Sequence, residues 1–377
     1  MNVSRVIAIA KKEFIHIFRD PRSLGMAIAI PMLLLILFGY ALTVDVDNVA
    51  LVVWNQDKGQ ESTDYILNFA ASKYFNVVAY VDSYDELQRF IDESKTFIMA
   101  LVIPYNFSRK LNSNQSVELQ LLVDGSDSNT ATIAIGYATA ISAKYNKRLL
   151  IQRMAEKGIK YRSPIDLRER VWFNPDLKSK NYIIPGLIAV IMMVIAALLT
   201  SLTIAKEWEM GTMEQLIATP IDPRELIAGK LLPYFLIGLF DVAVAVVMGQ
   251  FLFHVPLRGS VALLFILSGF FFAGALSLGL LISIVAKNQL VASQVAMVTT
   301  FLPAFLLSGF MYTISNMPTP IQVLTHFIPA RYFVVILKGI YLKGVGLRVL
   351  AMQAFYLLLF GFITMRLASK KFKKRVC

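Results

Sequence analysis

The chain has 377 residues, of which 56% are hydrophobic and only 16% are charged, and its mean hydropathy is +0.61. Soluble domains are about half apolar and a quarter charged, so this composition excludes a soluble globular protein and indicates an integral membrane protein. The formal net charge is +12, and the single cysteine, Cys377, leaves no partner for an internal disulfide.

Residues 1–22 predict an amphipathic helix on the cytoplasmic surface. Apolar side chains recur along one face of VSRVIAIAKKEFIHIF, while Lys11 and Lys12 lie on another face. We interpret this helix as an interfacial anchor, with a role in holding a cytoplasmic partner as the alternative. The chain then turns at RDPRS, and the first membrane span is expected at residues 23–44, because a span needs about 20 apolar residues. Five further stretches qualify as spans: residues 182–205, 231–253, 261–286, 290–312 and 349–365.

A polar segment, residues 45–181, separates the first two spans and has the size of a small domain. It holds 17 acidic and 17 basic residues, so the net positive charge belongs to the membrane part. Lys and Arg in short loops are retained in the cytoplasm, and with both termini inside, 15 such bases are cytoplasmic and 5 are outside. We therefore expect both termini in the cytoplasm and the polar domain outside.

The polar domain is predicted to have an α/β fold, because strand-like and helix-like segments alternate along it. The expected strands are residues 49–55, 75–81, 97–104 and 117–125, and the expected helices are residues 60–72, 83–94 and 128–157. Its carboxylates show no spacing typical of a nucleophile or a metal site, and His16, His254 and His326 are isolated. We expect neither catalysis nor metal binding.

The connection between the second and third spans reads AKEWEMGTMEQLIATPIDPRELIAGK. Thr212 begins a capping-box pattern in GTMEQL, which predicts the start of a short helix. Pro220 disfavours helical geometry before it, so the helix is expected at residues 211–219. Asp222 and Glu225 form a second capping box, from which a new helix runs into the third span.

The short helix and its approach are acidic. They contain three acids, Glu207, Glu209 and Glu214, and one base, Lys206. An interfacial anchor, in contrast, normally carries Lys or Arg that contact anionic lipid. We interpret this helix as facing the cytoplasm, where a protein partner could bind it.

Two features of the spans concern the interior of the bundle. Asp241 lies near mid-membrane, where an acid costs at least about 2.5 kcal/mol, so it should face the bundle interior and be paired or protonated. It is a candidate residue of a translocation path for protons or cations, or a structural hydrogen-bonding group. Ala275, Gly279 and Ser283 recur at four-residue spacing, which predicts close helix packing.

The segment before the last span is apolar but broken by prolines. Residues 313–346 contain Pro318, Pro320 and Pro329, and each half is too short to cross a membrane. We predict a re-entrant helical hairpin packed against other spans. The basic tail, residues 368–377, is interpreted as an orientation signal that contacts lipid head groups, and not as a nucleic-acid site.

This combination resembles the ABC-2 type permeases, the membrane subunits of one class of ATP-driven exporters. The similar stretches cover nearly the whole chain: EWEMGTMEQLIATP from Glu207, ELIAGKLLPY from Glu225, KEFIHIFRDPRSL near the amino end, DGSDSNTA at 124–131, LSGFMYTISNMP at 307–318 and IPARYF at 328–333. The closest subgroup has a large outside domain between the first two spans. That subgroup is linked to multidrug export alongside a periplasmic membrane-fusion protein.

The resemblance implies an α-helical polytopic protein of the bacterial cell inner membrane. It would have six transmembrane helices, a periplasmic α/β domain at 45–181, and a bundle at 182–367 that includes the re-entrant hairpin. Residues 211–219 would be a coupling helix that docks on a separate ABC ATPase subunit. The implied contact set is Glu207, Glu209, Gly211, Thr212, Glu214, Leu216 and Pro220. Two permeases, identical or similar, would pair to form the path.

The sequence has no ATP-binding motif of its own. A phosphate-binding loop needs G-x-x-x-x-G-K-[ST], but the pair Gly229–Lys230 is followed by Leu231. ATP would then be bound and hydrolysed by the partner, so the chain needs no cofactor and is not itself an enzyme. Two other functions stay open: a membrane-anchored receptor or scaffold with an outside binding domain, and a gradient-driven secondary transporter that uses Asp241.

Overall fold

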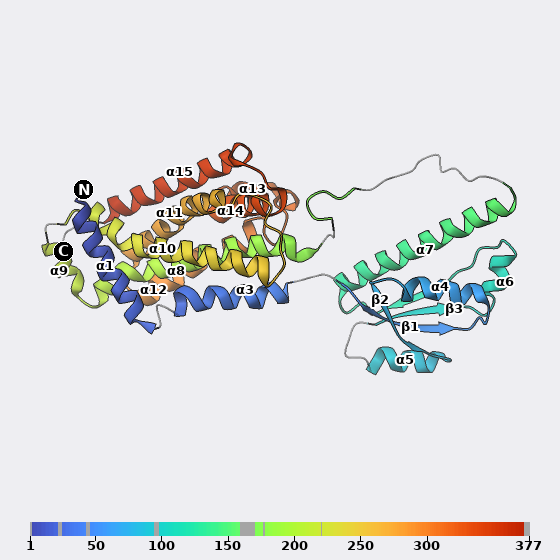
Figure 1. The fold of residues 1–377 in the computed structure, drawn as a ribbon. Helices are drawn as coiled ribbons and strands as arrows, with labels where there is room; N and C mark the ends of the chain where they lie inside the picture. The colour runs from blue at the N-terminus through green and yellow to red at the C-terminus, as the bar shows by residue number, and fades with distance from the viewer. Residues whose placement is uncertain are drawn as a thin grey trace. The chain divides into compact units, whose positions relative to one another are not determined.

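The computed structural model describes residues 2–21, 25–42, 46–93, 98–158, 170–175, 178–219 and 221–372. The chain divides into two compact units (Figure 1). Unit 1 combines Met1–Val44 with Arg170–Cys377, and unit 2 is Asp45–Glu169. Each unit encloses its own hydrophobic core.

Unit 2 is built on a four-stranded sheet with the order β2-β1-β3-β4. The strands are β1 (Val49–Asn55), β2 (Phe75–Tyr80), β3 (Ile98–Ile103) and β4 (Gln120–Val123). Strand β1 pairs in parallel with β2 and β3, and β4 pairs antiparallel with β3. All four strands lie within the ranges predicted from the sequence, although β4 is shorter than expected.

Helices cover both faces of this sheet (Figure 1). On one face, Leu51 and Leu101 pack with Phe69, and on the other, Val52 packs with Leu87. The first face carries α4 (Gln60–Ala70), α6 (Phe107–Asn112) and α7 (Ser128–Glu156), and the second carries α5 (Tyr84–Glu93). Helix α6 was not predicted, since six residues are too few to show a helical period.

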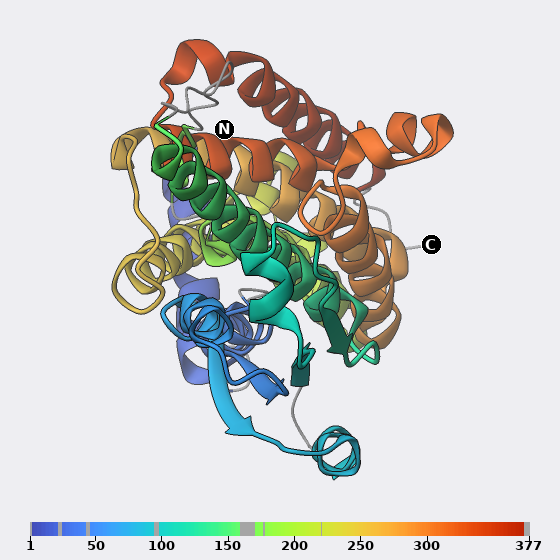
Figure 2. The ribbon, with the colours of Figure 1, turned by 90° about the vertical axis from the view of Figure 1, so that its right-hand side faces the viewer.

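Unit 1 is a helical bundle arranged around α8 (Ser179–Glu209), whose apolar part is 83% buried within the chain. The other long helices are α10 (Pro223–Phe251), α11 (Val261–Ala286), α12 (Gln289–Leu307) and α15 (Leu347–Lys371). Figure 2 shows the same helices after a turn of 90°. Helix α8 packs against α11, α12, α10, α14 (Pro329–Lys338) and α3 (Ile30–Ala41), so it forms the centre of the bundle.

The small residues of α11 bring it close to α8, as their spacing predicted. A Cβ atom on Gly279 would lie 2.4 Å from the Ala197 carbonyl oxygen, so only glycine fits there. One turn further, the Ser283 hydroxyl oxygen accepts hydrogen bonds from the backbone N–H groups of Ile204 (3.0 Å) and Ala205 (2.9 Å). The two helices are therefore joined by direct contact between backbones and small side chains.

The predicted spans differ from the structure at two places. The described part of the first span is a π-helical turn (Gly25–Ala29) and α3 (Ile30–Ala41), and its apolar helix is too short to qualify as a full span. Helix α12 ends at Leu307 and not at 312, because Gly309 takes a backbone φ of +79°, which the helix cannot accommodate. The five long helices each have the length and apolarity of a membrane span.

The proline-broken segment forms a bent helix pair. Helix α13 (Thr319–Thr325) and the helical run Pro329–Lys343 are inclined by 82° across a short break. The second part consists of α14 (Pro329–Lys338) and a π-helical turn (Gly339–Lys343). Pro329 supplies the start of α14, where its missing N–H group costs no hydrogen bond. The break is present as predicted, and the re-entry of this pair into a membrane stays a prediction.

Candidate functional site

One end of unit 1, here called the α9 end, combines α1 (Val3–Arg19), the short helix α9 (Thr212–Ala218), the last turns of α8 and the first turns of α10. Figure 1 shows α1 and α9 together at this end of the bundle. The acidic stretch that the sequence singled out lies here.

The centre of the α9 end is a buried ion-pair cluster. Lys230 of α10 is 2% exposed, and its ammonium group donates to Glu13 Oε1 of α1 and, at 3.1 Å, to Glu207 Oε1 of α8. Lys12 Nζ reaches the same Glu207 oxygen at 3.2 Å. Two cations thus balance two carboxylates, which is the condition under which buried charges are tolerated.

This cluster corrects the sequence-based interpretation of the acidic stretch. Lys206 is not the only base near Glu207, because Lys12 and Lys230 form ion pairs with it. The Glu207 side chain is only 11% exposed. Lys206 instead pairs with Asp20 at 3.7 Å. The charge of Glu207 therefore holds three helices of this chain together, and it does not form a free acidic surface.

Helix α9 is attached to the bundle at its start. Gly211 takes a backbone φ of +70°, which reverses the chain after α8, and Met213 is fully buried at the start of α9. The Thr212 hydroxyl donates to the Glu207 backbone carbonyl and carboxylate. Thr212 was expected to precede the helix as its cap, whereas it is the first residue of α9.

The remaining predicted contact residues have different environments. The Glu209 carboxylate accepts from the Gln289 backbone N–H at 2.9 Å and from its side chain, which fixes the start of α12. Glu214 is exposed on α9. The side chain of Leu216 and all of Pro220 lie outside the described residues.

The start of α10 joins α1 through the second capping box, which is confirmed. The Asp222 side chain accepts from Arg224 N–H at 2.7 Å, and the Glu225 carboxylate accepts from the backbone N–H groups of Asp222 (3.2 Å) and Asn2 (2.5 Å). Because Gly229 has no Cβ atom, Ile9 of α1 can lie directly on α10 there. Helix α1 is thus packed onto the bundle along one of its faces.

A cleft of about 700 Å³ opens beside the ion-pair cluster, between α1, α8, α9 and α10. His16, Asp20, Gln215 and Tyr234 line it together with the charged residues of the cluster. The cleft therefore combines a polar wall with exposed parts of α9.

Asp241 lies on α10 about three helical turns beyond Lys230. It is 2% exposed, as expected for an acid that faces the bundle interior, and Ile195, Tyr234 and Phe272 surround it. Its Oδ1 atom has no hydrogen-bond partner among the described residues. Asp241 is thus remote from the ion-pair cluster and does not belong to the α9 end.

The sequence reasoning missed Glu13 and the pairing role of Lys230. Ile9, Glu13 and Ile17 recur every four residues and are all buried, so Glu13 interrupts the apolar face of α1. An acid on the apolar face of a helix indicates that a cation is buried beside it. Lys230, at the start of an apolar run, is a cation that the same reasoning would expect to be buried. Nothing local connects the two residues, which are 217 positions apart.

Comparison with known proteins places this chain in a family. Residues 21–370 match the family described as "ABC-2 family transporter protein". Three permeases of Escherichia coli (strain K12) are similar along much of the chain. "Probable multidrug ABC transporter permease YbhS" is 36% identical over 373 residues, which are 99% of this chain and 97% of YbhS, and "Probable multidrug ABC transporter permease YbhR" is 32% identical over 375 residues, 99% of each chain. "Inner membrane transport permease YhhJ" is 25% identical over 296 residues, 78% of this chain and 77% of YhhJ. The chain therefore belongs to the ABC-2 transporter family and is a multi-pass membrane permease of that family.

Proposed function

We propose that the chain is the membrane subunit of an ATP-driven exporter that moves amphipathic compounds, drugs among them, out of the cell. It works with a separate ABC ATPase, which binds and hydrolyses ATP, and with a second permease, identical or similar, that completes the translocation path. A periplasmic membrane-fusion protein is a further partner. Family membership and the multidrug names of YbhS and YbhR support this proposal.

In this arrangement α9 is the coupling helix that receives the motion of the ATPase. One observation carries the assignment: α9 projects Glu214 outward while its buried Met213 and its Thr212 contact to Glu207 attach it to the bundle. A push on α9 reaches α8, α10 and α1 together, because Glu207 and Lys230 join these three helices. The α9 end and both termini then face the cytoplasm, and unit 2 is periplasmic.

The test reverses the charge of the exposed residue of α9. In Glu214→Lys we expect the copurified ATPase to be lost, or its hydrolysis to become insensitive to transported compounds, because the added cation repels a docking surface suited to an acid. The measurement is the amount and activity of ATPase that copurifies after gentle detergent extraction.

The matched control is Glu118→Lys, which changes the net charge equally at an exposed position of unit 2. This control should retain the ATPase, and both variants should insert in the membrane at wild-type levels. If Glu214→Lys retains both assembly and transport, α9 is not the coupling helix.

A further inference from the structure

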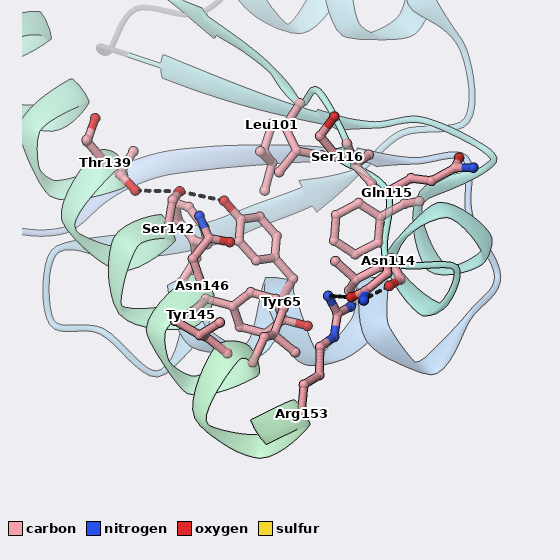
Figure 3. Close-up of a pocket in the computed structure, with 18 of the residues that line it drawn as sticks. Tyr65, Leu101, Asn114, Gln115, Ser116, Thr139, Ser142, Tyr145, Asn146 and Arg153 are labelled. Carbon is pink, nitrogen blue, oxygen red and sulfur yellow. Dashed lines mark hydrogen bonds between the residues drawn. The ribbon is translucent and has the colours of Figure 1, made fainter. Parts of the chain in front are cut away.

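Unit 2 contains a cavity of about 730 Å³ beneath helix α7. Its floor is apolar, with Phe69 of α4, Leu101 of β3 and Phe107 of α6. Helix α7 forms one wall, and the segment after α6, including Asn114 and the residues up to Leu121 of β4, forms the other (Figure 3). The volume falls within the range of about 300–1,000 Å³ that small-molecule sites occupy.

Polar groups line the cavity above this floor. The Tyr65 hydroxyl forms a 2.7 Å hydrogen bond with Ser142 Oγ of α7, and Thr139 and Asn146 lie beside them (Figure 3). Burial raises the pKa of Tyr65 above its ordinary value, although the bond to Ser142 opposes this, so the phenol is neutral at physiological pH. The Asn146 side chain makes no hydrogen bond to another described residue, which leaves it available to a ligand.

Arg153 and Lys157 provide the charge of the cavity. Arg153 donates to Asn114 Oδ1 at 2.6 Å and to the Leu111 carbonyl oxygen, so its guanidinium is held across the mouth between α7 and α6 (Figure 3). Lys157 lines the same end of the cavity and is exposed. A guanidinium fixed in this way is organised to receive an acidic group.

The described lining contains no carboxylate, although unit 2 as a whole is rich in acids. Glu61, an acid on α4, is occupied by a 2.7 Å hydrogen bond from Asn112 and does not line the cavity. An apolar floor with two bases at one end and no acid favours an anionic ligand over a cationic one.

We propose that this cavity binds an amphipathic small molecule with an acidic head group, whose apolar body lies against Phe69, Leu101 and Phe107 and whose head lies between Arg153 and Lys157. A long-chain carboxylate has this chemistry. The inference concerns unit 2 alone, and it does not depend on the coupling role of α9.

The test uses the full-length chain in lipid nanodiscs and a photoreactive analogue of palmitic acid, with the crosslinked peptides identified by mass spectrometry. We expect labelling in α7 and in residues 113–121, in addition to the spans, which any membrane-dissolved probe labels. The amine of the same chain length should label α7 and residues 113–121 about two- to tenfold less, because its charge is repelled.

Two variants locate the site, each with a control on the same helix. Asn146→Trp fills the cavity from an exposed position and should abolish the labelling of residues 113–121, whereas Lys147→Trp, which does not line the cavity, should leave it unchanged. Lys157→Glu should lower the labelling about two- to tenfold, and Lys144→Glu should not. Labelling of the spans serves as the internal reference in every sample.

Three outcomes would overturn the proposal: equal labelling by the acid and the amine, labelling that persists in Asn146→Trp, or labelling confined to the spans. Should Asn146→Trp fail to fold, as judged by its unfolding temperature, the exposed Lys157→Glu variant still decides the question. A result against this cavity leaves the Glu214 experiment unaffected, so the two proposals fail separately.

Discussion

Besides Glu225 at its start, helix α10 carries two buried ionisable side chains in contrasting surroundings, Lys230 and Asp241. Lys230, at the α9 end, forms ion pairs with Glu13 and Glu207, and Lys12 also pairs with Glu207. Asp241, about three turns further along, is equally buried but lies among apolar side chains and Tyr234, with its Oδ1 atom unpartnered among the described residues. Burial alone therefore does not define a role: Lys230 joins helices, whereas Oδ1 of Asp241 bonds to no described residue.

The largest effect is expected from removing the cation of the cluster. Lys230→Met leaves the buried carboxylate of Glu13 without a cation, and breaking a buried ion pair in this way costs about 3–5 kcal/mol. We expect a lower unfolding temperature in detergent and loss of monodisperse protein. Lys11→Met, which removes an exposed lysine of α1, is the control and should resemble the wild type.

A compensated variant separates charge from packing. Adding Glu13→Gln to Lys230→Met removes the unpaired charge, while Glu207 keeps its pair with Lys12, and this should recover part of the lost stability. If the single Lys230→Met variant is as stable as the wild type, the cluster does not hold α1, α8 and α10 together.

Another buried acid, Asp57 of unit 2, extends this contrast, because hydrogen bonds satisfy it and no ion pair joins it to another described residue. Its carboxylate accepts from Ser108 Oγ and from the N–H groups of Ser108 (3.3 Å) and Gly59 (3.2 Å). Burial raises the pKa of Asp57, but the bonds from Ser108 and Gly59 outweigh it, so the pKa lies below the ordinary value of 3.8.

A group with a lowered folded-state pKa stabilises the fold above its unfolded pKa, and the effect disappears as the pH falls through the folded value. Asp57→Asn should therefore destabilise unit 2 by about 1–3 kcal/mol at neutral pH. The difference should shrink below about pH 4. Hydrogen exchange of β1 amides across this pH range measures it, with the exposed Asp85→Asn as control. A difference independent of pH would contradict the charged state of Asp57.

The smallest stability effect is expected at Asp241. Asp241→Asn keeps the shape of the side chain and removes no partner from Oδ1, so the free energy of unfolding should change by less than about 1 kcal/mol. Export measured with ATP, with and without a proton or sodium gradient, then isolates function. ATP-driven export that persists in Asp241→Asn rules out a gradient-driven transporter, and export that is lost makes Asp241 a residue of the path.

Local patterns predicted much of this structure from the sequence. The capping box at Asp222, the strands of unit 2 and the helix at 211–219 depend on neighbouring residues, and each is present. The short helix α6 was missed because six residues are too few to show a helical period. The early end of α12 was missed because hydropathy does not indicate the positive φ of Gly309.

The site was predicted less completely, because its decisive contacts join distant parts of the chain. The acids of the α9 end were recognised, but the bond from Lys230 to Glu13 spans 217 positions, so the burial of Glu207 in their cluster could not be foreseen. The cavity under α7 likewise needs α4, α6 and α7 assembled before its lining exists.

The contact of Gly279 with α8 has a consequence for mutational tolerance. Every other amino acid adds at least one carbon atom at a place 2.4 Å from the Ala197 carbonyl oxygen, a backbone atom that cannot turn aside. At Gly269 the nearest atom is the tip of the Phe235 ring at 3.3 Å, which a small rotation would move. A mutational scan that measures only loss of function would therefore score Gly279 as essential, although glycine has no side chain with which to act. What the bundle requires at that position is empty space.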